Sequence, residues 1–478
     1  MIKETSIPFR WLFVCAYLFV LCSSCSPAPT SQITPIAVGT TPAKLTDSTI
    51  QVDLTTVPET TGTPRGTVSG IQAELTPTQT GSAEPVSDTW IKIYGGSREN
   101  MIADMVQAGD GGFLTIGGIG KAAGKSQEGG ILLMKTDQNG QVMWFRVYGG
   151  KEFDIGWTII PTHDGNFLIS GETNSIGAGG MDVYLIKVDP DGNEIWSHTY
   201  GGALDETVAS VRETLDGGYI LFGNCVDPED FITDPGIAGY AGFAGRSNIY
   251  VVRIDHDGNE IWSRTLDSEE NMIVSAGLAA PDGGFIVMAS IISFPSLDYD
   301  LYLLKMDGNG EQVWQRTWQE DSYSGYTISQ NSEQNYLISG VYKSDEITLG
   351  DIYLLIVDEQ GNELMNTKYG DPNRFEAGHG IIETYDGNYL VLGSATDNLY
   401  SASSDILLLM SDHSGNLLWQ KEISVLYHNK VNAFLALADG CYLIAGGASS
   451  ISGFQNSFLI KTDGGGNVVN MMEMVTLK

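Results

Sequence analysis

The chain has 478 residues, 42% of them hydrophobic and 10% aromatic, so it is long enough to bury a sizeable core. Its formal net charge of −34, from 59 acidic and 25 basic residues, argues against nucleic acid as a partner, because such a binder neutralises phosphates with clustered Lys and Arg. The same charge disfavours docking onto anionic lipid and suits a soluble exported domain.

Residues 1–24 resemble the signal peptide of a bacterial lipoprotein. Two basic residues precede an apolar run at 11–22, which is too short to span a bilayer comfortably and is typical of a secretory signal. Small residues then lead to Cys25, the cysteine that lipoproteins carry lipidated after cleavage. Cys22 departs from the family pattern, which usually has Leu there. An ordinary signal peptide cut nearby and an uncleaved anchor are the alternatives.

A polar spacer follows at residues 25–88. Positions 26–88 contain 15 Thr, 8 Pro and no aromatic residue, a composition that cannot bury enough apolar surface to offset the entropy of ordering the chain. We therefore expect a disordered linker, which together with lipid on Cys25 would hold the folded part away from a membrane. The expected location is extracytoplasmic, at the cell surface or on the periplasmic face.

The rest of the chain, residues 89–478, repeats one unit seven times. Each unit has a turn, an apolar run ending in Gly, a variable loop, an apolar run closing on Lys-x-Asp, a second turn, a Trp and Tyr-Gly-Gly. The turn marks lie 52 to 54 residues apart, with one interval of 66, at Asp110, Asp164, Asp216, Asp282, Gln334, Asp386 and Asp439. Periods of this size indicate stacked or radial modules.

Each unit predicts four short strands, named a to d in chain order. In the second unit, apolar runs on both sides of residues 163–166 predict one β-hairpin, and those around 190–193 predict another. One small twisted sheet cannot bury both faces alone, whereas seven packed around an axis can. The prediction is an all-β fold, a seven-bladed β-propeller of four-stranded antiparallel blades, with a solenoid as the alternative.

Ring closure is predicted at the start of the repeats. An eighth strand resembling strand d begins at Trp90, before any strand a, and the run at 468–475 is weaker. We expect the Trp90 strand to pair into the last blade, beside or in place of that run, and so to join the two ends. A free edge strand would otherwise invite aggregation.

A recurrent Trp near the start of strand d is predicted to pack one blade on the next. It occurs at Trp90, Trp144, Trp196, Trp262, Trp314 and Trp419, with Met365 in its place once. Five units have the spacing Asp-x-x-Gly-x-x-x-Trp, which resembles the tryptophan-docking motif of quinoprotein-like propellers. The whole unit is more similar still to exported repeat proteins of bacteria and archaea. Carbohydrate stacking is the alternative role of the rings.

The resemblance implies the fold and leaves the chemistry open, because function resides in loops grafted onto a fold. Quinoprotein-like families include quinone-dependent dehydrogenases and outer-membrane assembly lipoproteins. This chain departs from the dehydrogenases in having seven units where they usually have eight, and in lacking the adjacent Cys-Cys pair that many of them place over the cofactor. No cofactor is therefore expected.

Calcium is the one ion that the turns suggest. The segments 189–193 and 255–259 begin like oxygen-rich ion loops. Such loops need further ligands, however, and Glu194 and Glu260 run directly into strand d, so tight hairpin turns explain the same residues without an ion.

No catalytic set is evident. The sequence has no His-Glu-x-x-His, no Cys or His cluster at zinc spacing and no Gly-x-Ser-x-Gly. After removal of the signal and acylation of Cys25, Cys225 and Cys441 remain, and nothing supports a bridge between them.

Binding residues are expected where the b-to-c and d-to-a loops meet, because these loops vary and the other turns do not. We call this side the loop-rich face and the opposite side the tight-turn face. The largest insertion, at 225–248, supplies the candidates Asp230, Tyr240 and Arg246. The d-to-a loops supply Arg98, Asp154, Asp205, Asp321, Arg374 and His428. Loop capping is the alternative role of Asp154 and Asp205, which recur at matching positions.

The resulting hypothesis is a lipid-anchored extracytoplasmic monomer that acts as a binding or scaffold module for a protein or a glycan. The runner-up is an exported enzyme, either a quinoprotein-like oxidoreductase or a glycan-active protein, with carboxylates gathered at the axial mouth. A purely structural spacer is the third reading.

Overall fold

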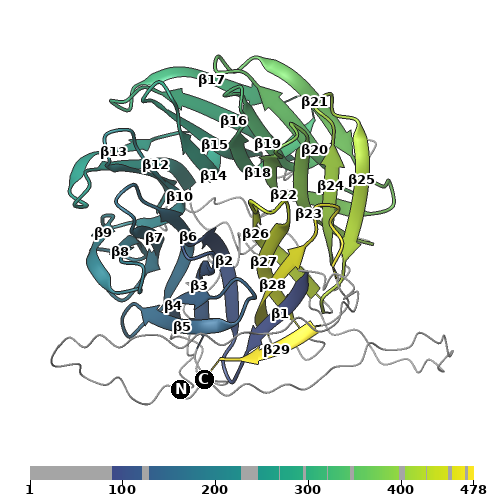
Figure 1. Cartoon of the computed structure of the whole chain (residues 1–478). Coiled ribbons are helices and arrows are strands. Elements are labelled where there is room, and N and C mark those ends of the chain that lie inside the picture. The colour runs from purple at the N-terminus through teal and green to yellow at the C-terminus, as the bar shows by residue number, and fades with distance from the viewer. Residues whose placement is uncertain are drawn as a thin grey trace, which may run out of the picture.

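The structure, a computed structural model, describes residues 89–120, 129–227, 246–268, 270–293, 298–319, 321–344, 349–397, 404–426, 428–449, 455–468 and 472–477. The predicted signal peptide, the lipidation site Cys25 and the linker lie outside these ranges. Within them the chain forms strands and turns, and seven sheets surround a central axis (Figure 1). None of the described residues belongs to a helix that could cross a membrane. The predicted seven-bladed β-propeller is confirmed.

Blades 1 to 3 are consecutive four-stranded antiparallel sheets. Blade 1 contains β2 (Asn100–Gln107), β3 (Phe113–Gly120), β4 (Gly129–Thr136) and β5 (Val142–Tyr148). Blade 2 contains β6 (Asp154–Pro161), β7 (Phe167–Thr173), β8 (Asp182–Val188) and β9 (Glu194–Tyr200). Blade 3 contains β10 (Asp205–Glu213), β11 (Tyr219–Asp227), β12 (Arg246–Ile254) and β13 (Glu260–Leu266).

Blades 4 to 6 have the same topology. Blade 4 contains β14 (Asn271–Ala279), β15 (Phe285–Ser293), β16 (Asp298–Met306) and β17 (Gln312–Trp318). Blade 5 contains β18 (Ser322–Gln330), β19 (Tyr336–Lys343), β20 (Asp351–Val357) and β21 (Glu363–Tyr369). Blade 6 contains β22 (Phe375–Glu383), β23 (Tyr389–Thr396), β24 (Asp405–Ser411) and β25 (Leu417–Ile423).

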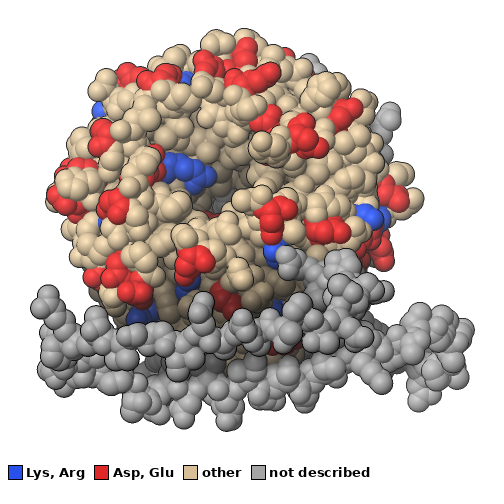
Figure 2. Space-filling model, in the orientation of Figure 1, with Lys and Arg blue, Asp and Glu red and all other residues tan. Residues whose placement is uncertain are grey.

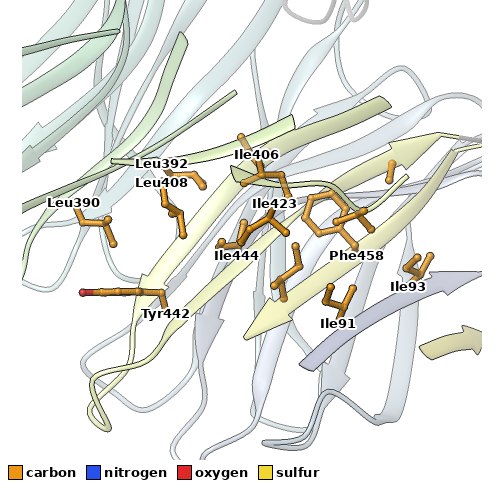
Figure 3. Packing of buried hydrophobic residues seen from close by; sticks show 14 of the residues in the cluster. Ile91, Ile93, Leu390, Leu392, Ile406, Leu408, Ile423, Tyr442, Ile444 and Phe458 are labelled. Atoms are coloured by element: carbon orange, nitrogen blue, oxygen red, sulfur yellow. The ribbon is translucent and has the colours of Figure 1, made fainter. Parts of the chain in front are cut away.

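Blade 7 joins the two ends of the propeller. It contains β26 (His428–Ala436), β27 (Tyr442–Ser449) and β28 (Gln455–Thr462), followed by β1 (Trp90–Gly95) and β29 (Met472–Thr476). β1 pairs antiparallel with β28, and β29 pairs parallel with the outer side of β1. The predicted closure by the Trp90 strand is therefore confirmed, and the C-terminal run lies beside that strand. Figure 3 shows Ile91 and Ile93 of β1 within the core of this blade.

The core lies between the blades. Seven clusters of buried hydrophobic side chains occur, and each combines residues of two neighbouring blades. One of them, which includes Tyr94, Met105 and Leu443, joins blade 7 to blade 1. Because every blade buries both faces against neighbours, the ring is continuous and the open solenoid is excluded.

The turns on the tight-turn face share one hydrogen-bond pattern. In the a-to-b turn of blade 1, the amide of Ala108 donates to the carbonyl of Gly112 at 2.8 Å, and the amide of Gly111 donates back to the carbonyl of Ala108 at 2.9 Å. The a-to-b and c-to-d turns of all seven blades repeat it. The fourth residue always has a positive φ, which favours glycine, and only Gln334 is not glycine there.

The Lys-x-Asp motif serves both turns of a blade. In blade 2, Lys187 reaches across to Asp164 of the a-to-b turn, with 2.6 Å between Nζ and Oδ2. Asp189, two residues later, caps the c-to-d turn by accepting the amides of Asp191 and Asn193. Lys135, Lys305 and Lys461 form the same ion pair in their own blades. The motif is thus a structural signature.

The recurrent Trp packs each blade onto the next. A Cβ atom added to Gly192, in the c-to-d turn of blade 2, would lie 2.7 Å from the ring of Trp144 in blade 1. Only glycine leaves room for the ring, which explains the Asp-x-x-Gly-x-x-x-Trp spacing. The remaining contacts are Trp90 with Gly140, Trp196 with Gly258, Trp262 with Gly310, Trp314 with Gly361, Met365 with Gly415, and Trp419 with Gly466.

Candidate functional site

The inner strand of every blade has a one-residue β-bulge at the same place. In each blade, one residue of this strand has no partner in strand b. From blade 1 to blade 7 these unpaired residues are Ala103, Trp157, Ala209, Ser275, Tyr326, His379 and Asn432. A bulge re-aims the side chain of its extra residue. All seven residues are partly exposed, although they belong to the innermost strands. They form one level of the axial channel, called here the bulge ring.

A second level lies three residues further along each inner strand, toward the tight-turn face. Its members are also partly exposed and are Val106, Ile160, Arg212, Leu278, Ser329, Ile382 and Leu435. Five of the seven are aliphatic, so we call this level the aliphatic ring. Figure 2 shows the centre of the molecule hollowed, with basic atoms on one wall of the hollow and acidic side chains scattered around the rim.

Two aromatic residues of the bulge ring lie against each other. The rings of Tyr326 and His379 are stacked, with 5.6 Å between centroids and an angle of 18° between planes. The imidazole Nε2 of His379 is 2.9 Å from the hydroxyl of Ser394. Burial, together with the charge of Lys430, lowers the pKa of His379 to about 4. His379 is therefore neutral at neutral pH and contributes a flat, hydrogen-bonded surface to the channel.

Two ionisable groups on the inner strands of blades 1 and 3 interact electrostatically without forming an ion pair. Asp104, beside the bulge in β2, accepts the amides of Met105 at 2.8 Å and Ile159 at 3.0 Å, and burial raises its pKa to about 6. Arg212 in β10 donates to the carbonyl of its neighbour Val211 at 2.8 Å. Burial lowers the pKa of Arg212, and Asp104 offsets this at a distance. Among the described residues, no carboxylate forms an ion pair with this guanidinium.

Four carboxyl groups gather between blades 2 and 3 on the loop-rich side. Burial raises the pKa of Glu172 to about 7, and the amide of Val208 partly offsets this by donating to Oε1 at 3.3 Å. Burial also raises the pKa of Asp182 and of Glu206. Asp205 couples electrostatically to all three. The indole nitrogen of Trp157 faces Glu172 but does not reach hydrogen-bond geometry.

These carboxylates also hold loops together. Asp182 accepts the amides of Ala178 and Gly179, and Glu206 accepts the amide of Gly202 at 3.0 Å. The described residues contain no group of three His, Cys, Asp or Glu side chains arranged to hold a metal ion. In the two turns considered for calcium, Asp189 and Asp255 accept backbone amides of their own turns. Both aspartates therefore act as caps of hairpin turns.

The predicted d-to-a loop residues do not form one cluster. Asp154 is buried and accepts the amide of Gly150 at 2.7 Å together with the hydroxyls of Thr173 and Ser175, so it caps its loop. Asp205 caps another loop by accepting the amide of Met181 at 2.8 Å. Asp154 and Asp205 therefore both cap loops, which was the predicted alternative to a binding role.

Three further d-to-a residues lie in separate places. Arg98 is exposed in the loop before β2. Arg374 pairs within its own blade with Glu422, at 2.6 Å from Nη1 to Oε1, and Asp321 accepts the hydroxyl of Tyr342. A binding role for these residues stays a prediction.

The remaining candidates lie largely outside the described residues. Asp230 and Tyr240 are not among them. Arg246 begins β12 and His428 begins β26, but only their backbones are described. Cys225 and Cys441 lie in different blades, and the thiol of Cys225 lies 3.5 Å from a carboxylate oxygen of Glu206.

A separate groove of about 630 Å³ lies at the outer rim between blades 3 and 4, lined by residues that include Leu266, Asp267 and Gln315. In blades 1, 2 and 5, strand d ends in a Tyr that donates to the next blade's turn glycine, as Tyr148 does to Gly192 at 2.6 Å. Leu266 takes the place of that Tyr in blade 3.

Comparison with known proteins finds solved structures that match at low identity. No family profile and no curated protein matches the chain. Among solved structures, an ACO/RPE65 chimera matches at 13% identity and a TM-score of 0.41, covering 68% of this chain and 74% of the chimera. A puromycin hydrolase matches at 15% and 0.40, covering 75% of this chain and 51% of the hydrolase, so the match spans about half of that protein.

An α-L-arabinanase of Penicillium chrysogenum, complexed with arabinobiose, matches at 10% identity and a TM-score of 0.41. The match covers 78% of this chain and 97% of the arabinanase.

Proposed function

We propose that the chain is a lipid-anchored, extracytoplasmic binding or scaffold module that recognises a protein or a glycan through its loop-rich face. The support is the asymmetry of the ring. Every turn on the tight-turn face repeats one hydrogen-bond pattern, whereas the connections between strands b and c on the other face range from 4 residues (294–297) to 18 (228–245). A rigid scaffold with one uniform and one variable face is typical of proteins that bind through loops.

The anchor is tested by cell fractionation. The Cys25→Ala variant should move from the membrane fraction to the soluble exported fraction, because it loses the acylated cysteine. The Cys22→Ala variant is the matched control and should stay with the membrane. Retention of Cys25→Ala at wild-type level would contradict lipidation at this residue.

The binding face is tested with substitutions on opposite faces. Alanine at Asp230, Tyr240 and Arg246 together should remove recovered partners or bound glycans, measured by affinity capture and on a glycan array. The control replaces Asp257 and Asn259 with Ala on the tight-turn face, where both side chains are exposed or turn-bound. If the two variants recover the same partners as the wild type, the insertion is not the site.

The enzyme alternative has one observation in its favour. Glu172, with a pKa of about 7, lies in the field of Asp205, and a protonated carboxyl near an ionised one is the arrangement that glycan hydrolysis requires. We propose it second because both groups accept backbone amides. Activity on a glycan panel that is lost in Glu172→Gln and kept in Asp189→Asn would place this alternative first.

A quinone-dependent reaction does not fit the residues present. The adjacent cysteine pair of the dehydrogenases is absent from the sequence, and Cys225 and Cys441 lie in different blades. The recurrent Trp rings pack on turn glycines of neighbouring blades. We derive no step through a quinone.

A further inference from the structure

Within the described ranges the buried cations of strands c are paired, whereas the partly exposed Arg212 of an inner strand has no ion-pair partner. Lys135, Lys187, Arg253, Lys305 and Lys461 in strands c each contact an aspartate of the adjoining turn. Arg212 occupies an inner strand, is only partly exposed, and makes one hydrogen bond, to the carbonyl of Val211. A charge that is partly removed from water and has no close partner destabilises a protein unless an ion or ligand compensates it. The guanidinium of Arg212 is therefore available to bind an anionic ligand.

The environment of Arg212 selects what kind of anion fits. Its neighbours in the aliphatic ring are Ile160 on blade 2 and Leu278 on blade 4, and Val106, Ile382 and Leu435 continue the ring. Ser329 interrupts it, but its hydroxyl donates to the carbonyl of Ile381 at 2.8 Å and is satisfied. Asp104 lies within electrostatic range of Arg212 but is occupied by two backbone amides. A mostly apolar wall with one available basic group is typical of sites for small organic ligands with a single anionic group.

The protein's own carboxylates do not occupy this position. Asp104 is held by two backbone amides and forms no ion pair with Arg212. The aspartates nearest to the tight-turn mouth in blades 2 and 3, Asp164 and Asp216, are bound to Lys187 and Arg253. In a chain of net charge −34, an unpaired guanidinium inside the ring is therefore a local reversal of the overall charge, and Figure 2 shows basic atoms on the wall of the central hollow.

We propose that the axial channel binds a small organic carboxylate with an alkyl chain. Arg212 receives the carboxylate through its guanidinium, and the aliphatic ring covers the chain. Guanidinium and carboxylate pair through two parallel hydrogen bonds, which gives such a site directional preference over a simple counter-ion. The inference goes beyond recognition at the loop-rich face because it assigns a small-molecule site inside the ring, and it depends neither on the lipid anchor nor on the insertion.

The test uses the full-length chain and hexanoate, with binding followed by saturation-transfer NMR and titration calorimetry. Hexanoate should bind saturably, and Arg212→Gln should weaken it at least tenfold. Arg212→Lys should retain part of the affinity because it keeps the charge. Arg316→Gln is the matched control, since Arg316 is exposed on the outer strand β17, and this variant should bind hexanoate as the wild type does.

A second variant addresses folding. Leu278→Asp puts a carboxylate beside Arg212 and should abolish hexanoate binding while the near-UV circular dichroism stays that of the folded protein. Hexylamine, with the same chain and the opposite charge, should not bind. The proposal is overturned if Arg212→Gln binds hexanoate with unchanged affinity. It is also overturned if the wild type shows no saturable binding of hexanoate. Displacement of hexanoate by equimolar sulfate would show an adventitious ion site only and overturns it too.

Discussion

At the scale of single residues, Gln334 is the one non-glycine residue at the positive-φ position of the described turns. It therefore tests how much this backbone conformation costs in stability. It has a φ of 67° in the a-to-b turn of blade 5, where the other blades have glycine. The left-handed region costs a residue with a side chain roughly 1 kcal/mol. Gln334→Gly should therefore raise the free energy of unfolding by about 1 kcal/mol, measured by urea denaturation.

The matched control for this prediction is Gly387→Ala in the equivalent turn of blade 6. A Cβ atom there meets no other atom within 4 Å, so the substitution changes only the backbone preference. It should lower stability by about 1 kcal/mol. If both substitutions leave the unfolding midpoint unchanged, the left-handed conformation does not limit stability.

Glu172 gives the protein a specific pH dependence. Its pKa is raised from 4.5 to about 7 mainly by burial, so the folded state holds this proton more tightly than the unfolded state. Its contribution to stability is fully present below pH 4.5 and is lost as the pH rises to about 7, and that loss is about 3 kcal/mol. Glu172→Gln should remove the dependence, so the variant gains relative to the wild type between pH 4.5 and pH 8.

The comparison is made by urea denaturation at both pH values. Asp189→Asn is the control, because the pKa of Asp189 is lowered by the Asn193 contacts and the aspartate is already ionised throughout this range. The stability difference of the control should be the same at pH 4.5 and pH 8. A constant difference for Glu172→Gln as well would contradict a raised pKa.

At the scale of elements, the contact between strand d and the next turn is the unit that repeats around the ring. Trp144 lies against Gly192, and deletion of a packed Trp ring typically costs about 3 kcal/mol or more. Trp144→Ala should lower the free energy of unfolding by about 3 kcal/mol. Met143→Ala, one residue earlier and 52% exposed, should change it by less than about 0.5 kcal/mol. Equal effects would show that the ring does not stabilise the blade contact.

The repeated strands and turns could be predicted from the sequence, whereas the bulge ring, whose residues vary between blades, could not. Asp-Gly turns, Lys-x-Asp and the Trp spacing recur because each performs the same contact in nearly every blade, so seven copies make the pattern visible. The bulge residues vary from blade to blade, with only alanine occurring twice, as Ala103, Trp157 and His379 illustrate. When the seven strands a are aligned by the turns that follow them, the bulge residues occupy the same position in every repeat. This shared position is the sequence signal that could have revealed the bulge ring.

The charge of the channel was also hidden in the sequence. Arg212 stands in a segment of alternating apolar residues and looks like one more exposed position of a strand. Only the packing of neighbouring blades around the axis places it at the same level as Ile160 and Leu278. Likewise, Glu172 follows the Gly that ends the apolar run, and its burial against blade 3 depends on tertiary packing that no local pattern records.

At the scale of the whole molecule, stability depends on a closed ring. Each blade is held mainly by clusters shared with its two neighbours, and blade 7 takes its fourth strand from the other end of the chain. Contacts are therefore local within blades but long-range at the closure. The strand β1 carries both the Trp90 contact to Gly140 and the hydrogen bond from the Tyr94 hydroxyl to the Gly140 carbonyl, at 2.7 Å.

Removal of the closing strand should open the ring. A chain that begins at residue 97 lacks β1, and β29 then loses the strand on which it pairs. Buried residues such as Phe458 and Leu459 of β28 would lie on a free edge strand, which promotes aggregation. We expect this truncation to elute as aggregates in size-exclusion chromatography. Truncation after residue 468 removes only the outermost strand, so that variant should remain monomeric and unfold cooperatively at lower urea. If the chain beginning at residue 97 is instead a stable monomer with the wild-type unfolding midpoint, closure through β1 does not hold the propeller together.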